Sequence, residues 1–201
     1  MRSNLLCASL ALALLSPLAA HAGLLGSWIG EATTNRPAAS TTGSCRPEAG
    51  FSPEGSASRL VDRAIDHAQH SIRLAAYSFT SADVVRHLID AKQRGVDVAV
   101  IVDEKTNLVE DRSGRARAAL NLLVNAGIPT RTINVYLSFH DKSMVIDGKD
   151  VETGSFNFSG AAATKNSENA LVLWDCPVMA EPYLEHWQSR WPQASDFHST
   201  Y

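Results

Sequence analysis

The stretch SIRLAAYSFTSADVVRHLIDAKQRGVDVAVIVDE, residues 71–104, contains a strand, a helix and a second strand in succession. Its first nine residues are mainly apolar and predict a buried strand. The pattern T-x-x-D that follows, Thr80 to Asp83, is a capping box that predicts a helix start, and Gly95 predicts the end of that helix. Residues 96–104 are nearly continuous in branched apolar side chains, which is typical of a strand whose two faces are both covered. The stretch therefore predicts an α/β fold.

The alternation continues on both sides of this stretch. Upstream, Ser52 and Pro53 predict the start of another helix. Downstream, we expect a helix at 115–127, a weaker strand at 128–136, a pair of strands within 138–160, a strand at 168–174 and a closing helix at 177–191. Because strands alternate with helices and then cluster, we expect a single domain with a mixed β-sheet flanked by helices.

The first 22 residues, MRSNLLCASLALALLSPLAAHA, have the features of a secretory signal peptide. They contain one basic residue, an apolar run from Leu5 to Leu15, and small residues at Ala20 and Ala22. The run is shorter than the roughly 20 residues that a membrane-spanning helix needs. We therefore expect cleavage after Ala22 and an exported protein, periplasmic or secreted, without a membrane anchor.

The composition sets limits on the remaining chain. Of the 201 residues, 45% are hydrophobic and 19% are charged, which is typical of a soluble globular protein. Residues 23–50 are rich in small and polar residues and predict a flexible arm, so that the domain is expected to span 51–201. Loss of Arg2 with the leader moves the net charge from −3 to −4. A mildly acidic protein has no overall attraction to nucleic acid, so any polyanion site must be local.

Two cysteines, Cys45 and Cys176, remain after the leader is removed. An oxidising compartment permits a disulfide between them, but their spacing does not show whether they meet. A disulfide and two free thiols are equally compatible with the sequence. Their spacing does not match a zinc site.

The stretch SFHDKSMVIDGKDVETGSFNFSG, residues 138–160, concentrates polar side chains on two strands joined by a turn at 147–150. Residues two apart on a strand share a face, so His140 and Lys142 point the same way and Asp141 points the other way. This opposite orientation argues against a metal-dependent HD hydrolase, in which the His-Asp pair lies on a helix among other ligands.

The position of the turn within 147–150 determines which residues of the second strand face His140. A loop of Gly148 and Lys149 places His140 opposite Asn157, and Lys142 opposite Ser155.

A loop shifted back by one residue places His140 opposite Ser155 instead. Either register gathers phosphate-binding groups on one face, beside Gly154, which allows a ligand to approach the backbone closely. A solvated hairpin would explain any one of these residues, but it explains less well why several share a face.

Two carboxylates near the hairpin could support a site on this polar face. A nucleophilic histidine needs a carboxylate to hold its tautomer, and Glu168 at the start of the next strand is the best candidate for His140. Asp147 has the wrong parity to join the polar face. We expect it to fix the hairpin or to act from behind the site.

These motifs resemble the phospholipase D superfamily. HDKSMVID, residues 140–147, matches its H-x-K-x4-D signature, and GSFN, residues 154–157, matches its G-S-x-N continuation. FSPEGSAS, IRLAAYSFTS, AKQRGVDVAVIVDE, TKNSENALV and LEHWQSRW are similar to its small, exported, metal-independent endonuclease branch, and the resemblance covers residues 51–201. It implies an α-β-α sandwich and a phosphodiesterase that forms a covalent phosphohistidine without a cofactor.

In such a reaction each residue of the signature has a role. His140 attacks phosphorus, Lys142 and Asn157 bind the non-bridging oxygens, and Ser155 supports them. The leaving oxygen needs a proton from a second group, for which a histidine is well suited near neutral pH.

The chain has one copy of the signature, whereas larger members of the superfamily have two. The other histidines lack the accompanying residues; they are His67, His70, His87, His186 and His198. We therefore expect a two-fold homodimer that shares one active site. Two lysines and two asparagines would supply the charge stabilisation that a metal ion gives elsewhere, so no metal is expected.

A cluster of basic residues indicates the class of substrate. Arg112, Arg115 and Arg117 surround a predicted helix N-terminus, where phosphates are favoured, and Lys165 extends the group. This predicts nucleic acid, DNA or RNA, cut without sequence specificity, although a solvated basic turn would look the same. The alternatives are a lipid phosphodiesterase or phosphatidyl transferase, for which no amphipathic membrane helix is evident, and a non-catalytic polyanion-binding protein.

Overall fold

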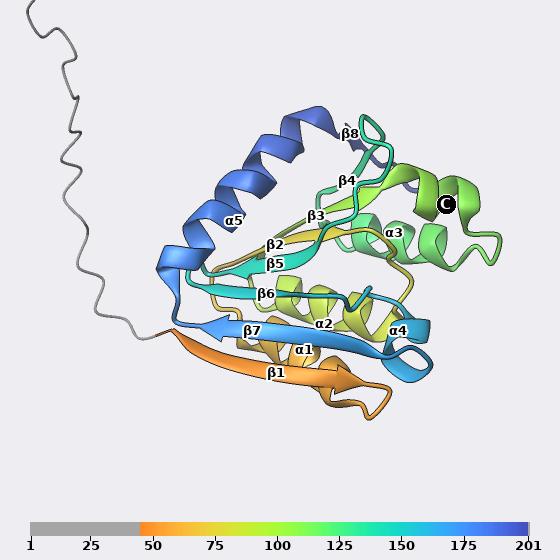
Figure 1. The fold of residues 1–201 in the computed structure, drawn as a ribbon. Coiled ribbons are helices and arrows are strands. Elements are labelled where there is room, and N and C mark those ends of the chain that lie inside the picture. The colour runs from red at the N-terminus through yellow and green to blue at the C-terminus, as the bar shows by residue number, and fades with distance from the viewer. Residues whose placement is uncertain (1–44, 201) are drawn as a thin grey trace, which may run out of the picture. The chain divides into compact units, whose positions relative to one another are not determined.

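The computed structural model describes residues 45–200, which form an eight-stranded mixed sheet with helices on both faces (Figure 1). The strands are β1 (Arg46–Ser52), β2 (Ser71–Ala76), β3 (Asp97–Asp103), β4 (Thr130–Ile133), β5 (Lys142–Ile146), β6 (Asp150–Gly154), β7 (Glu168–Trp174) and β8 (Ser195–Asp196). The helices are α1 (Ser56–His67), α2 (Ala82–Gln93), α3 (Arg115–Asn125), α4 (Gly160–Thr164) and α5 (Pro177–Arg190). A π-helical segment, Lys105–Glu110, follows β3, and a 3-10 turn, Trp191–Gln193, follows α5. The predicted signal peptide and residues 23–44 of the predicted arm lie outside the described residues.

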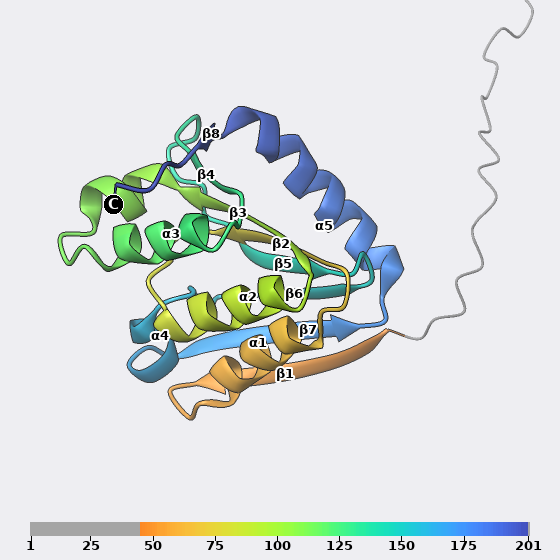
Figure 2. The ribbon, with the colours of Figure 1, turned by 180° about the vertical axis from the view of Figure 1, so that it is seen from behind.

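The strands are ordered β1-β7-β6-β5-β2-β3-β4-β8 across the sheet. β2, β3 and β4 are parallel to one another, and the other pairings are antiparallel. α1, α2 and α3 cover one face of the sheet (Figure 2), and α5 crosses the other (Figure 1). The predicted mixed α/β domain is therefore confirmed.

The strand-helix-strand unit at 71–104 forms as predicted, with a shifted cap. The Ser81 hydroxyl, rather than that of Thr80, accepts a hydrogen bond of 3.3 Å from the backbone N–H of Val84. Gly95, with φ 94°, follows the end of α2. Such a backbone conformation favours glycine, which has no Cβ to clash.

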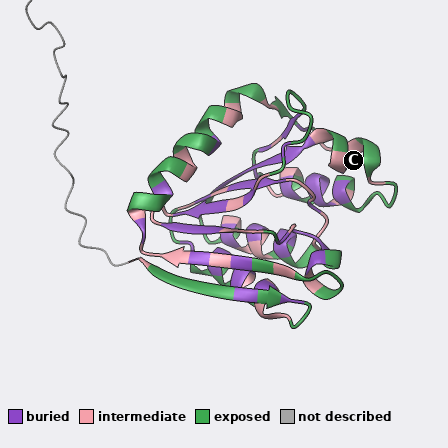
Figure 3. Cartoon of the chain, in the orientation of Figure 1, coloured by how far each residue is buried: buried purple, intermediate pink, exposed green. Residues whose placement is uncertain are grey.

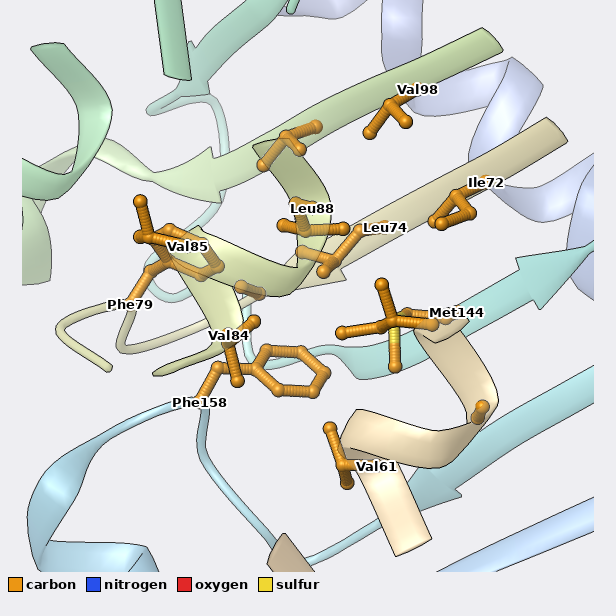
Figure 4. Close-up of a cluster of buried hydrophobic side chains, with 14 of the residues drawn as sticks. Val61, Ile72, Leu74, Phe79, Val84, Val85, Leu88, Val98, Met144 and Phe158 are labelled. Carbon is orange, nitrogen blue, oxygen red and sulfur yellow. The ribbon is translucent and has the colours of Figure 1, made fainter. Parts of the chain in front are cut away.

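The hydrophobic core lies in two layers, one on each face of the sheet. The larger layer packs α1, α2 and α3 against the strands; Figure 4 shows side chains such as Val61, Leu88, Met144 and Phe158 in contact there. On the other face, Trp187 of α5 packs against β2, β3 and β4, and Ala180 packs against β5 and β6. Because both faces are covered, the central strands are almost entirely buried (Figure 3).

The domain begins earlier than the composition indicates. β1 pairs antiparallel with β7 along its whole length, so the prediction of a flexible arm is wrong from Arg46 onward. Most of the residues of β1 are exposed, so the strand has no apolar alternation that would reveal it (Figure 3). The following helix starts at Ser56 rather than at Ser52 and Pro53, after Gly55 at φ 80°.

A disulfide joins Cys45, directly before β1, to Cys176, directly before α5. The structure thereby decides between the two alternatives that the sequence leaves open. Among residues 45–200 no helix is both long and apolar enough to cross a membrane.

The hairpin of β5 and β6 has neither of the predicted registers. Ser143 pairs with Thr153 and Ile146 pairs with Asp150, which lies midway between the two registers expected from the sequence. Asp147 and Gly148 both have positive φ, and the N–H of Lys149 donates to the carbonyl of Ile146.

This turn corresponds to a type I′ turn, but the ladder resumes only one residue later. Lys149 therefore has no pairing partner on β5, and its carbonyl accepts a hydrogen bond from the N–H of Cys176. The extra residue puts Lys142 level with Gly154, so the predicted pairing of His140 and Lys142 with Asn157 and Ser155 is wrong.

Candidate active site

Five of the predicted site residues lie at one end of the sheet: His140, Lys142, Ser155, Asn157 and Glu168. There β2 and β3 end, β5 and β7 begin, and β6 ends; in Figure 1 it is the end at which the arrow of β1 points. Open α/β sheets bind ligands outside the carboxyl ends of their parallel strands, and this end is of that kind.

His140 and Lys142 are in direct contact. The ammonium nitrogen of Lys142 lies 3.3 Å from Nδ1 and 3.4 Å from Nε2 of the His140 ring, and it donates to the His140 carbonyl at 2.9 Å. Tyr77, just after β2, packs its ring against the His140 ring at a centroid distance of 4.4 Å. The Lys142 ammonium also lies 5.1 Å from the centre of the Tyr77 ring. The His140 imidazole and the Lys142 ammonium thus both lie against the ring of Tyr77.

Lys142 is only 9% exposed. Burial lowers the pKa of Lys142, while the nearby carboxylates of Glu168 and Asp141 act in the opposite direction. A poorly hydrated ammonium interacts strongly with a phosphate oxygen, because fewer water molecules must be displaced from it.

Side chains rather than a strand ladder hold the segment that carries His140. The N–H of Phe139 donates to the buried carboxylate of Asp103 at 2.8 Å. On the other side of His140, the carboxylate of Asp141 lies 2.8 Å from Nε2 of His186 on α5. His140 therefore lies between two anchored neighbours.

Tyr77 is fixed in a similar way. Asn107, which is buried in the π-helical segment after β3, donates to the carbonyl of Tyr77 at 2.6 Å and accepts from the N–H of Phe79 at 2.8 Å. The sequence analysis singles out neither Tyr77 nor Asn107. The only available signal is an aromatic residue at the end of a strand, which is a weak one.

Ser155 and Glu168 form a second group at the same end of the sheet. Ser155 donates its hydroxyl hydrogen to Glu168 at 2.6 Å and accepts from the N–H of Asn169 at 3.0 Å. Glu168 also accepts from the side chain of Asn166 at 2.9 Å. Within residues 45–200 the hydrogen bonds of Glu168 go to these partners and not to His140, so the structure does not show the expected hold on the histidine tautomer.

Asn157 follows the point where β6 leaves its ladder. The N–H groups of Ser155 and Phe156 both donate to the carbonyl of Asn169, which turns the chain here. The side-chain oxygen of Asn157 is buried and has no hydrogen-bond partner among the described residues. Such an unpaired polar atom is costly unless a ligand or water satisfies it.

Gly154 has a structural reason to be glycine. A Cβ at this position would lie 2.3 Å from the carbonyl oxygen of Asn169 on β7. The neighbouring strand, rather than a ligand that approaches the backbone, therefore accounts for this glycine.

Asp147 lies at the opposite end of β5 from His140. Its carboxylate accepts hydrogen bonds of 2.7–2.9 Å from the backbone N–H groups of Gln69, His70 and Ser71. Burial raises the pKa of Asp147, but these three hydrogen bonds outweigh it, and the pKa falls below its ordinary value. The residue ties the hairpin to the start of β2 and does not reach the site.

The predicted basic residues are exposed and do not contact His140. Arg112 lies in the turn before α3, Arg115 and Arg117 lie on its first turns, and Lys165 follows α4. None of their side chains forms an ion pair among the described residues, whereas Arg46, Arg63 and Arg73 each do.

An open pocket of ≈ 460 Å³ adjoins the site on the face covered by α5. Its lining includes His140, Lys142 and side chains of α5. In the described part of the chain, no group of three or more histidine, cysteine or acidic side chains is placed to hold a metal ion.

Comparisons with known proteins agree with this geometry. The family described as cardiolipin synthase, PLD-like domain, matches residues 61–191. A crystal structure of Nuc from Salmonella typhimurium, described as a phospholipase D family member, is 51% identical, has a TM-score of 0.74, and covers 78% of this chain and 100% of its own.

The names of two curated relatives refer to lipid substrates. A protein named phospholipase D from Rickettsia felis is 36% identical over 140 residues, or 70% of this chain, and mouse mitochondrial cardiolipin hydrolase is 32% identical over the same length. The chain spans 66% and 60% of these two relatives. The matched family, the Nuc structure and the arrangement of His140, Lys142, Ser155 and Asn157 lead to one conclusion: this chain belongs to the phospholipase D superfamily.

Proposed function

We propose that this protein is an exported phosphodiesterase that hydrolyses nucleic acid, DNA or RNA, through a covalent phosphohistidine, and that it does so as a homodimer. The observation that carries the proposal is the contact between the ring of His140 and the ammonium group of Lys142, 3.3 Å away. It provides a nucleophile and a phosphate-binding cation at one point.

The reaction has two balanced steps. In the first, an unprotonated nitrogen of His140 attacks phosphorus, a P–N bond forms, the bond to the leaving oxygen breaks, and that oxygen takes a proton from a general acid. In the second, water attacks the phosphohistidine, gives its proton to the same group, and the P–N bond breaks. Lys142 and the amide of Asn157 stabilise the charge on the non-bridging oxygens.

The general acid is best supplied by a second copy of the chain. Within residues 45–200, His186 is paired with Asp141 and His87 lies 2.7 Å from Asp66, so both have other partners. A two-fold axis at the site end would bring a second His140 to the far side of phosphorus. One His140 would then act as nucleophile and the other as acid.

The exposed basic residues support a nucleic-acid substrate. The described residues form no ion pair with Arg112, Arg115, Arg117 or Lys165, although Arg115 acts electrostatically on the carboxylate of Asp111. Most of this positive charge is therefore available to a polyanion. Contacts of this kind to phosphates carry no base information, so cleavage should not depend on sequence.

A lipid substrate is the second candidate, and two observations favour it. The curated relatives have the names phospholipase D and mitochondrial cardiolipin hydrolase. In addition, the loop before His140 exposes Val135 (58%), Tyr136 (38%) and Leu137 (91%). Such a loop would suit contact with a lipid surface or with a second copy of the chain.

The disulfide supports export. Bonds such as Cys45–Cys176 form and persist in oxidising compartments and are rare in the cytosol. The proposed signal at residues 1–22 would bring the chain there.

Cleavage of plasmid DNA tests the activity. We expect nicking and degradation by the wild-type protein with a strong chelator present, because no group of three or more histidine, cysteine or acidic side chains in the described residues is placed to hold a metal ion. We expect loss of cleavage in His140→Ala. Gln188→Ala, on the exposed side of α5, is the matched control. If the protein cuts neither DNA nor RNA but hydrolyses cardiolipin vesicles, the lipid reaction replaces this proposal. If the chelator abolishes activity and added zinc or magnesium restores it, the metal-free mechanism is wrong.

Mixed dimers test the shared site. When wild-type chains are mixed with an excess of inactive His140→Ala chains, most wild-type chains enter mixed dimers, and activity per wild-type chain should fall. Light scattering gives the mass of the active species. Full activity in a strictly monomeric form would refute the homodimer.

A further inference from the structure

The pocket beside the site has two unlike walls. One wall comes from α5 and consists of Met179, Pro182, Tyr183 and His186. The other comes from the ends of β5 and β6 and includes Ser143, Thr153 and Gly154 next to His140 and Lys142. A phosphate held by His140 and Lys142 would therefore lie at the rim of this pocket, with room beside it for one of the groups that the phosphate joins.

The size of the pocket exceeds what the phosphate needs. Its ≈ 460 Å³ lies in the range of small-ligand sites and would accept a sugar with a base.

The chemistry of the α5 wall fits a nucleobase. Tyr183 is partly buried, and its ring packs against the cluster formed by Val145, Val151 and Ala180, which fixes its position. A ring that is held in place and open on one side is what base stacking requires, and Met179 adds an adaptable apolar contact.

The acidic group in the pocket, Asp141, has a partner on α5. Its carboxylate lies 2.8 Å from Nε2 of His186. The same contact ties α5 to the residue that follows His140, so the wall and the nucleophile keep a fixed relation to each other.

We propose that this pocket binds the nucleoside next to the scissile phosphate, with its base stacked on Tyr183. The inference rests on the proposed nucleic-acid activity and adds a subsite to it. A glycerol headgroup, such as that of phosphatidylglycerol or cardiolipin, would take little advantage of a flat aromatic wall, because it has neither a π-face to stack nor a cationic group.

The test compares two single-stranded oligonucleotides with identical phosphates. One has normal bases, and the other has abasic tetrahydrofuran residues on both sides of the only bond that can be cut, the remaining linkages being methylphosphonates. We expect the wild-type kcat/KM to be about tenfold higher on the first, the lower part of the range that one stacked base gives. In Tyr183→Ala this ratio should fall to about one, whereas Tyr183→Phe, which keeps the ring, should retain it.

The control is Gln188→Ala, on the same helix but outside the pocket, and it should keep the wild-type ratio. Equal wild-type rates on the two oligonucleotides, or a Tyr183→Ala ratio that stays near ten, would overturn the subsite while leaving the nuclease activity intact. If the wild type cuts neither and instead hydrolyses phosphatidylglycerol or cardiolipin vesicles, the proposed function itself fails and the subsite falls with it.

Discussion

At the scale of single residues, the signature identifies the reactive groups better than their partners. His140 and Lys142 are two positions apart, and this spacing alone predicts that they share a direction; the structure puts them in contact. The partner of Glu168 could not be predicted, because it depends on how the chain turns after Gly154. That turn places Ser155 against Glu168.

Asp147 belongs to the same signature, but its role is structural. Asparagine tolerates the positive φ of this position, so Asp147→Asn removes the charge without straining the backbone. Because three backbone N–H groups lose a charged acceptor, we expect the free energy of unfolding to fall by about 1–3 kcal/mol at pH 7. Urea unfolding measures this, and the rate of phosphodiester cleavage per folded molecule should remain.

The pH dependence of this loss has a definite sign. The pKa of Asp147 is lowered in the folded state, so its contribution is complete above the ordinary value of 3.8 and disappears as the pH falls through the lower folded value. Asp90→Asn, whose side chain forms no hydrogen bond or ion pair in the structure, is the control. A variant as stable as wild type at pH 7 but catalytically dead would place Asp147 in the chemistry after all.

At the scale of elements, the hairpin shows why registers are hard to predict. The sequence limits the turn to 147–150, but whether Lys149 joins the ladder depends on Cys176, far along the chain, which binds the Lys149 carbonyl. A local pattern contains no information about such a contact. The strand-helix-strand unit at 71–104 was predictable because its periodicity and caps are local.

β6 also contains a buried acid, Glu152, between Met144 and Val172 on the neighbouring strands. Burial raises the pKa of Glu152 to about 8. The folded protein therefore keeps this proton up to about pH 8, whereas the unfolded chain releases it near the ordinary value of 4.5. Stability should consequently decline as the pH rises between these two values and level off above them.

Glu152→Gln should remove this decline, because glutamine does not titrate. Relative to wild type, the variant should gain a few kcal/mol in the free energy of unfolding between pH 5 and pH 9. Urea unfolding at the two pH values measures the difference, with exposed Glu54→Gln as the control. Parallel pH profiles for Glu152→Gln and wild type would show that the acid is ionised in the fold.

At the scale of the whole molecule, the alternation of strands and helices is sufficient to predict the layered α/β domain. It is not sufficient to predict β1, because the exposed side chains of this edge strand resemble those of a linker. β1 is held by its ladder to β7 and by the bond between Cys45 and Cys176.

Loss of that disulfide should destabilise the domain without altering the site. The bond spans 131 residues, and removal of a native disulfide typically costs about 2–5 kcal/mol. We expect this decrease in the free energy of unfolding both in reductant and in the double variant Cys45→Ser, Cys176→Ala. The double variant should not respond to reductant, and a wild-type midpoint that reductant leaves unchanged would show that the bond contributes nothing.

The odd number of residues in the β5–β6 turn limits how far the length of this loop can vary among relatives. Surface loops usually accept insertions and deletions, but here Asp147 is bound to residues 69–71 and Lys149 is the residue that sets the register. Deletion of one residue would slip β6 by one position and exchange its two faces, turning Glu152 toward α5 and turning Val151 and Thr153 toward the layer of α1 and α2. Natural relatives and engineered libraries should therefore tolerate substitutions at Gly148 or Lys149 far better than any change in the length of this loop.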